Sequence, residues 1–199
     1  MKQIIWFFAS IVLFSSCQSK EKTKENIVKT IALDTLSKTV AGTANLNEVP
    51  EKDHKTVQMI REQLLVLLKN DLPAMKKEDR FFFYDAFDLN NDKKDDYFVG
   101  FSNSYFCGSG GCSGFILNND GSLINKFSVT DFPILVTTTS SEKFYDLLMK
   151  SGGLYHLVKM KEGKYPSNPS IEEKWKGEAP KESIKVLDIY DKKLEKYSF

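Results

Sequence analysis

Residues 81–103 read FFFYDAFDLNNDKKDDYFVGFSN, in which two aromatic and β-branched runs flank a polar loop rich in aspartate. Short runs of this composition are typical of β-strands, and clusters of Asn, Asp and Gly between them are typical of turns. We therefore predict strands over Phe81–Phe87 and Tyr97–Asn103. Five further runs have the same character: Gly114–Leu117, Leu123–Val129, Ile134–Thr139, Phe144–Lys150 and Leu154–Lys161.

Two turns and one helix complete the predicted fold. Asn119-Asp120-Gly121 and Ser151-Gly152-Gly153 each separate two predicted strands, and such residues favour hairpin turns. Upstream, aliphatic residues recur at helical spacing through His54–Asn70, which predicts an amphipathic helix with its apolar stripe in the core. A last strand is predicted over Ile184–Ile189. The fold class is therefore α+β, with one amphipathic helix packed on an antiparallel β meander of about seven short strands.

Length and composition exclude several classes of protein. A chain of 199 residues is too short for two large domains. With 41% hydrophobic and 28% charged residues, it is too rich in core-forming residues for a fully disordered chain and too charged for a multi-span membrane protein. A net charge of +1 and only two arginines, Arg61 and Arg80, argue against a nucleic-acid partner.

The amino terminus has the features of a secretory signal. Lys2 precedes the apolar run Ile4–Phe14, and the small residues Ser15 and Ser16 follow it. A helix of that run reaches about 16 Å, which is too short to cross a hydrocarbon core of about 30 Å. We therefore predict a signal peptide over residues 1–16, a flexible polar tether over residues 17–52 and a single α+β domain over residues 53–199.

The end of this signal, Leu13-Phe14-Ser15-Ser16-Cys17, resembles a bacterial lipobox. The resemblance implies that Cys17 is the lipid attachment site and becomes the new amino terminus. The chain would then be a lipoprotein held at a membrane of the bacterial cell envelope. Ordinary signal cleavage near Ser16 is the alternative interpretation.

The other two cysteines, Cys107 and Cys112, enclose the turn Gly108-Ser109-Gly110-Gly111. In an exported chain an even pair of cysteines indicates a disulfide, and glycines allow the tight turn that so short a loop requires. A two-cysteine zinc site is the main alternative, but no further Cys or His ligands lie nearby in the sequence. A redox motif would normally have two residues between its cysteines.

The loop between the first two strands has the ligand pattern of a calcium site. Side-chain oxygens of Asp88, Asn90, Asp92 and Asp96 and the carbonyl of Lys94 would supply the oxygen ligands that a hard cation needs. The loop is not an EF-hand, because its flanks are predicted strands and its twelfth position is not a bidentate Glu. It resembles the calcium-binding loops of FG-GAP and integrin-type β-propeller repeats, except that Lys93 stands where those loops usually have glycine. A metal-free polar hairpin turn is the alternative.

From Phe81 to Ser170 the order of an aspartate-rich loop and a Cys-Gly-Ser-Gly-Gly-Cys turn resembles a group of bacterial exported and lipoprotein domains. That resemblance implies no activity. A β-propeller is excluded because the chain has one such loop and no repeats.

No sequence motif for catalysis is present. His54 and His156 lie in no recognisable nucleophile context and are interpreted as exposed or structural. The first hypothesis is a non-enzymatic envelope lipoprotein that binds a protein or glycan and carries a weak structural calcium site. The second is an inhibitor or immunity-type lipoprotein that inserts the Cys107–Cys112 loop into an attacking enzyme. A metal-assisted hydrolase using Asp88 to Asp96 is the third.

Aromatic residues surround the aspartate loop and the glycine turn. They are Tyr97, Phe101, Tyr105 and Phe106. Residues of this kind at strand spacing usually belong to the core, and a partner-binding surface is the alternative.

Overall fold

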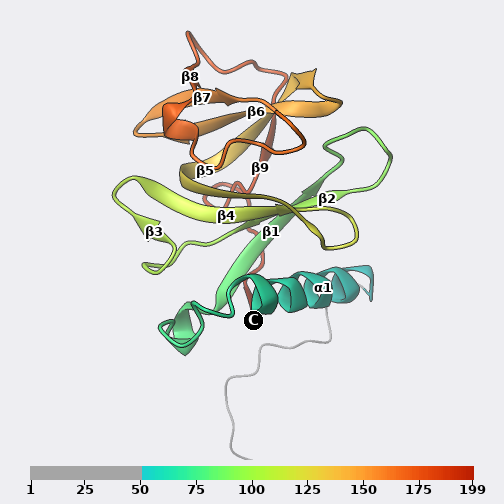
Figure 1. Ribbon diagram of the computed structural model, residues 1–199, viewed down its shortest axis with the longest axis vertical. Helices are drawn as coiled ribbons and strands as arrows, with labels where there is room; N and C mark the ends of the chain where they lie inside the picture. Colours follow the sequence, from blue (N-terminus) through green and yellow to red (C-terminus); the bar gives the residue numbers. More distant parts are fainter. Residues whose placement is uncertain (1–50) are drawn as a thin grey trace, which may run out of the picture. The chain divides into compact units, whose positions relative to one another are not determined.

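The computed structural model describes residues 51–199, with side chains from Asp53 onward. In this part of the chain one helix packs against a large antiparallel sheet, which confirms the predicted α+β class (Figure 1). The predicted signal peptide, the lipid attachment site Cys17 and most of the tether lie outside the described residues. Within residues 51–199, no helix is long and apolar enough to span a membrane.

The described chain begins with helix α1 (Glu51–Leu67) and the 3-10 helix η1 (Lys77–Asp79), and a second 3-10 turn, η2 (Pro169–Ile171), comes late. The strands are β1 (Phe81–Phe87), β2 (Asp96–Gly100), β3 (Cys107–Gly108), β4 (Gly111–Leu117), β5 (Leu123–Ser141), β6 (Phe144–Ser151), β7 (Leu154–Val158), β8 (Glu173–Lys174), β9 (Ile184–Val186) and β10 (Tyr197–Ser198). Their order in the sheet is β10-β1-β2-β4-β5-β6-β7-β8, with β3 beside β4 and β9 beside β5.

The sheet has ten strands rather than about seven, and one long strand replaces two predicted ones. β5 runs without interruption through Pro133, where the sequence suggested a break. Proline cannot donate a ladder hydrogen bond, and here it falls in the irregular stretch of pairing with β6 between Asp131 and Leu135. The three additional strands, β3, β8 and β10, are two-residue pairings too short to leave a periodic signal.

The predicted hairpin turns are confirmed. Leu117 of β4 and Leu123 of β5 form the pair next to the first turn, and Gly121 within this turn has φ 85°. β6 and β7 pair from Ser151 and Leu154. Both turns therefore formed where local turn chemistry indicated them.

The helix-side core lies between α1 and the layer made by β1, β2 and β4. Isolated amphipathic helices are marginal in water, so this burial is what holds α1 in place. The buried members of the helix-side core are Val57, Ile60, Leu64, Leu68, Met75, Phe82, Val99, Phe101, Phe115 and Leu117.

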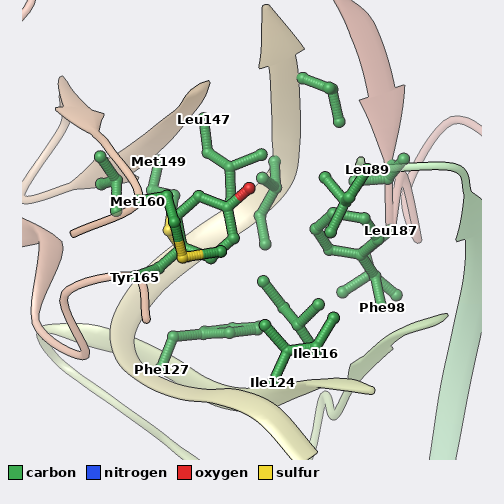
Figure 2. Packing of buried hydrophobic residues seen from close by; sticks show 14 of the residues in the cluster. Leu89, Phe98, Ile116, Ile124, Phe127, Leu147, Met149, Met160, Tyr165 and Leu187 are labelled. Carbon is green, nitrogen blue, oxygen red and sulfur yellow. The ribbon is translucent and has the colours of Figure 1, made fainter. Parts of the chain in front are cut away.

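The inner core lies on the opposite face of the same strands and includes Leu147 and Met149 of β6 (Figure 2) and Val158 of β7. Phe98 and Ile116 belong to it, whereas their neighbours Val99 and Phe115 belong to the helix-side core. Side chains alternate between the faces of a strand, so a strand buried on both faces has no polar side. This explains the continuous apolar runs of β2 and β4.

Candidate functional site

The aspartate-rich loop joins β1 to β2, and the pair Phe87 and Asp96 closes it. Leu89 fixes the loop to the body of the domain. Its side chain is fully buried in the inner core, and its carbonyl accepts a hydrogen bond from the backbone N–H of Tyr145 in β6 at 2.9 Å. The loop is therefore anchored by packing and not only by its own hydrogen bonds.

Side-chain oxygens of the loop accept hydrogen bonds from its backbone. Asp88 accepts from the N–H groups of Asp92 and Lys93 at 3.1 and 2.8 Å. Asn90 Oδ1 accepts from Asp92 N at 3.0 Å, and Asp92 Oδ1 accepts from Lys94 N at 2.8 Å. These contacts fold Asp88, Asn90 and Asp92 onto one exposed turn, as polar residues at turns commonly do.

Lys93 has φ 69°, in the left-handed region that favours glycine. Lysine is therefore an unfavourable residue for the backbone conformation of this turn. Asn91 also has positive φ, 59°, but asparagine tolerates this region better than lysine.

Asp96 lies beneath the exposed turn and is only 1% exposed. Its Oδ2 accepts a hydrogen bond from Leu89 N at 3.1 Å, and the backbone N–H of Asn119 also favours its charged form. Burial, with a smaller contribution from the nearby carboxylates of Asp92 and Asp88, nevertheless raises the pKa of Asp96 from 3.8 to about 6. Asp96 thus ties the loop to the neighbouring β4–β5 turn.

The raised pKa of Asp96 predicts a pH-dependent stability. The folded state holds the proton of Asp96 more tightly than the unfolded chain does. Protonation of Asp96 therefore stabilises the folded state increasingly as pH falls through about 6, and this stabilisation is complete below 3.8. In buffer with EDTA, the free energy of unfolding of Asp96→Asn minus that of wild type is expected to be about 2 to 3 kcal/mol larger at neutral pH than at about pH 4, because the variant lacks the buried charge. Urea denaturation measures it.

Asp95→Asn is the matched control, because it removes one carboxylate from the exposed neighbouring position. If the two variants respond to pH in the same way, the burial of Asp96 does not affect its protonation.

The fit of the five predicted ligands to a calcium ion is partial. The structure brings Asp88, Asn90 and Asp92 together, whereas Asp96 is buried and engaged by backbone N–H groups. The N–H of Lys94 contacts Asp92, so this residue also borders the turn. Within residues 51–199, no group of three or more His, Cys, Asp or Glu side chains is arranged to hold a metal ion.

The predicted disulfide between Cys107 and Cys112 is confirmed. The two residues face each other across the β3–β4 hairpin, and Gly108, Ser109 and Gly110 at its tip are exposed. Gly111 has φ 117°, and a Cβ there would lie 2.6 Å from the backbone nitrogen of Thr130. Only glycine fits at this position, which therefore fixes the path of the turn.

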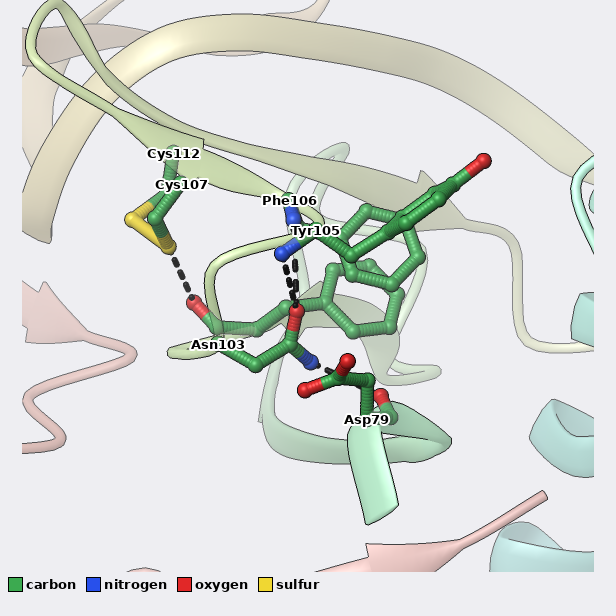
Figure 3. The surroundings of a disulfide bond; sticks show 7 residues. Asp79, Asn103, Tyr105, Phe106, Cys107 and Cys112 are labelled. Atoms are coloured by element: carbon green, nitrogen blue, oxygen red, sulfur yellow. Dashed lines mark hydrogen bonds between the residues drawn. A yellow bond between two sulfur atoms is a disulfide. The ribbon is translucent and has the colours of Figure 1, made fainter. Parts of the chain in front are cut away.

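Asn103 holds the base of this turn (Figure 3). Its Oδ1 accepts hydrogen bonds from the backbone N–H groups of Tyr105 and Phe106 at 3.0 and 3.2 Å. Its Nδ2 donates to the carbonyl of Asp79 at 2.8 Å, which links the turn to η1. The sequence analysis missed this residue; the signal that could have found it is an asparagine at the start of a polar turn, because its side chain can accept a hydrogen bond from the backbone two residues later.

The aromatic residues near the turn divide between core and surface. Phe101 is fully buried and stacks on Phe106 with ring centroids 3.7 Å apart, while Tyr97 is half-buried against Tyr84. Tyr105 is 38% exposed, and its hydroxyl donates to the carboxylate of Asp71 at 2.9 Å. One aromatic ring therefore lies at the surface beside the disulfide turn.

The two histidines are separated in the fold. His54 is exposed on α1, and His156 is buried in β7 with its Nδ1 2.9 Å from the carbonyl oxygen of Glu172. This contact supports the interpretation of His156 as a structural residue.

Comparison with known protein families, with curated proteins and with solved structures gives no match to this chain.

Proposed function

We propose that this chain is a lipid-anchored protein of the bacterial cell envelope whose domain binds a protein or glycan partner without catalysing a reaction. The observation that carries the proposal is the Cys107–Cys112 disulfide, which closes an exposed turn. Disulfides persist in oxidising compartments outside the cytosol, so the disulfide supports export. The lipobox-like residues that end at Cys17 supply the proposed anchor.

The disulfide turn is a suitable binding element because it is rigid before any partner arrives. The disulfide, Gly111 and the hydrogen bonds of Asn103 each restrict its backbone, and Tyr105 offers an exposed ring beside it. Binding by a preorganised turn loses little conformational entropy, and tyrosine is enriched at binding hot spots.

The lipid anchor is tested by mass spectrometry and membrane fractionation of native cells. Wild type should carry lipid on Cys17 and sediment with membranes, whereas Cys17→Ser should be unprocessed or soluble. A wild-type protein that retains residues 1–16 and has free thiols at Cys107 and Cys112 would contradict export.

The binding surface is tested with Gly108→Arg, which has open space for a side chain at the tip of the turn. We expect this variant to keep its folding stability and to lose the partner captured by crosslinking in native envelopes. Leu154→Arg makes the same charge change at an exposed position in β7 and should retain the partner. Equal capture by both variants would exclude the turn as the binding surface.

An inhibitor or immunity-type lipoprotein is the second candidate. The specific observation in its favour is that the exposed residues Gly108, Ser109 and Gly110 project from a closed hairpin, a form that fits an enzyme cleft. Inhibition of a lysozyme or an envelope-attacking toxin by wild type, and its loss in Gly108→Arg, would favour this candidate over general partner binding.

We also propose a weak structural calcium site at Asp88, Asn90, Asp92, Lys94 and Asp96. The shared turn of Asp88, Asn90 and Asp92 supports it, while the burial of Asp96 leaves that carboxylate the least available. A calcium site of the extracellular type has a dissociation constant of roughly 0.1 to 1 mM. When calcium binds, its role is to hold the loop, and no catalytic step is assigned to it.

Calcium at about 5 mM should therefore raise the unfolding midpoint of the full-length chain by roughly 3 to 8 °C, because only the folded state holds the ion. Asp92→Asn should abolish the rise, and Asp95→Asn, which removes an exposed carboxylate outside the ligand set, should retain it. An unchanged midpoint in wild type would eliminate the site.

A further inference from the structure

Three tyrosine rings lie in a row across the adjacent strands β10, β1 and β2. Tyr197, Tyr84 and Tyr97 belong to these strands in that order. The ring centroids of Tyr84 and Tyr197 are 5.6 Å apart, and those of Tyr84 and Tyr97 are 6.2 Å apart. All three rings pack against the helix-side core, so they share one face of the sheet. Each residue is only half-buried, which leaves part of this tyrosine row open to solvent.

Two carboxylates lie at the hydroxyl ends of these rings. The Tyr84 hydroxyl is 3.5 Å from Oδ1 of Asp53 in the first turn of α1, and the Tyr197 hydroxyl donates to Oε2 of Glu195 at 2.8 Å. Burial, then Asp53 and to a smaller extent Glu195, raises the pKa of Tyr84 to about 12. Burial, then Glu195 and to a smaller extent Asp53, also raises the pKa of Tyr197. Each carboxylate therefore acts on both hydroxyls, so the two negative charges lie beside the same pair of rings.

The two carboxylates have no cationic partner within the part of the chain that the structure describes. Among the ion pairs of residues 53–199, none includes Asp53 or Glu195. Lys196, next to Glu195 in the chain, instead lies 3.5 Å from the ring centroid of Phe81, which is on the opposite face of β1 from the tyrosine row. The two tyrosine hydroxyls stay neutral at physiological pH because their pKa values are raised. The group therefore carries two uncompensated negative charges.

A primary ammonium group on an alkyl chain matches both parts of this group. Its three N–H donors suit the carboxylate oxygens, its charge is attracted to aromatic faces within about 6 Å, and its alkyl chain can pack along the rings. A sugar ring would stack best on a flat aromatic surface. The planes of Tyr84 and Tyr97 are inclined by 68°, and those of Tyr84 and Tyr197 by 45°, so the row is not flat. The geometry favours the cation.

We propose that the tyrosine row, together with Asp53 and Glu195, forms a binding site for a primary alkylammonium group. The side chain of a lysine on a partner protein and a free amine share this chemistry. The site lies at the start of α1, whereas the disulfide turn contacts the chain beyond the end of this helix, so the two surfaces are separate. The proposal depends neither on the disulfide turn as a binding element nor on the lipid anchor.

NMR titration of the full-length chain with Nα-acetyl-lysine amide tests the site. The tyrosine ring signals should shift and saturate, whereas Nα-acetyl-norleucine amide, which lacks the charge, and sodium chloride of equal ionic strength should give no saturating shift. Asp53→Asn and Glu195→Gln should each raise the dissociation constant about two- to fivefold, and the double variant should abolish measurable binding. Glu182→Gln is the matched control, because it removes an exposed carboxylate that does not affect the pKa of either tyrosine.

n-Butylammonium chloride distinguishes the two sources of the ligand. Tighter binding of the lysine amide would assign the site to a peptide, and tighter binding of n-butylammonium would assign it to a free amine; both results support the proposal. Glu195 is exposed, so Glu195→Gln should fold as wild type does and keeps the test valid if another variant is unstable.

Three results would overturn the proposal. The first is an equal shift with the norleucine amide or with sodium chloride, which means that apolar contact or screening alone moves the signals. The second is a dissociation constant that is unchanged in both Asp53→Asn and Glu195→Gln. The third is a response of the tyrosine signals to an N-acetylglucosamine oligomer and not to the lysine amide, which would make the row a sugar-binding surface.

Discussion

Gly114→Ala should destabilise the domain by about 3 kcal/mol or more, because β4 has no room for a side chain at this position. A Cβ on Gly114 would meet the ring of Phe127 in β5, its pairing partner on one side. It would also lie 2.5 Å from the carbonyl oxygen of Val99 in β2 on the other side. Backbone on one side and a fully buried ring on the other cannot both move aside.

Urea denaturation of Gly114→Ala measures this effect, and Gly108→Ala is its control. Gly108 lies in the paired strand β3, and a Cβ there would meet nothing within 4 Å. The control should remain within about 0.5 kcal/mol of wild type. If Gly114→Ala is as stable as Gly108→Ala, the close approach of the three strands described here is wrong.

Leu64→Ala is expected to cost about 2 to 5 kcal/mol, because Leu64 is fully buried in the helix-side core and its truncation leaves a cavity. The adjacent Leu65 is 41% exposed, so Leu65→Ala should cost far less, within about 1 kcal/mol. The two variants make the same chemical change one residue apart. Chemical denaturation of both therefore reports which face of α1 packs on the sheet.

The opposite order of effects would mean that α1 is rotated by about one residue, or 100°. Equal, small effects would mean that α1 does not pack on the sheet. Both leucines belong to the aliphatic residues from which the helix over His54–Asn70 is predicted, and the structure assigns only Leu64 to the core.

Elements with a strong local signal were predictable from the sequence. The periodic aliphatic residues of α1, the turns at Gly121 and at Gly152, and the disulfide between two cysteines five residues apart all depend on neighbours in the chain. Turn residues, helical periodicity and short loop closure act over a few residues, so a single sequence records them.

The rest depends on contacts between distant segments. The continuity of β5 through Pro133 follows from its pairing with β6 and β9, which lie later in the chain. The burial of Asp96 follows from the neighbouring β4–β5 turn and the inner core. The spacing of the loop residues predicted five similar ligands, whereas the structure buries one of them, Asp96. Periodicity does not report such tertiary burial.

The long strand β5 makes the two layers of the sheet inseparable. Its first half, through Thr130, pairs with β4, and its second half, from Asp131, pairs with β6 and β9. A fragment of the chain that ends within Leu123–Ser141 lacks part of the interior strand with which both layers pair. We therefore expect that neither layer folds as an independent module.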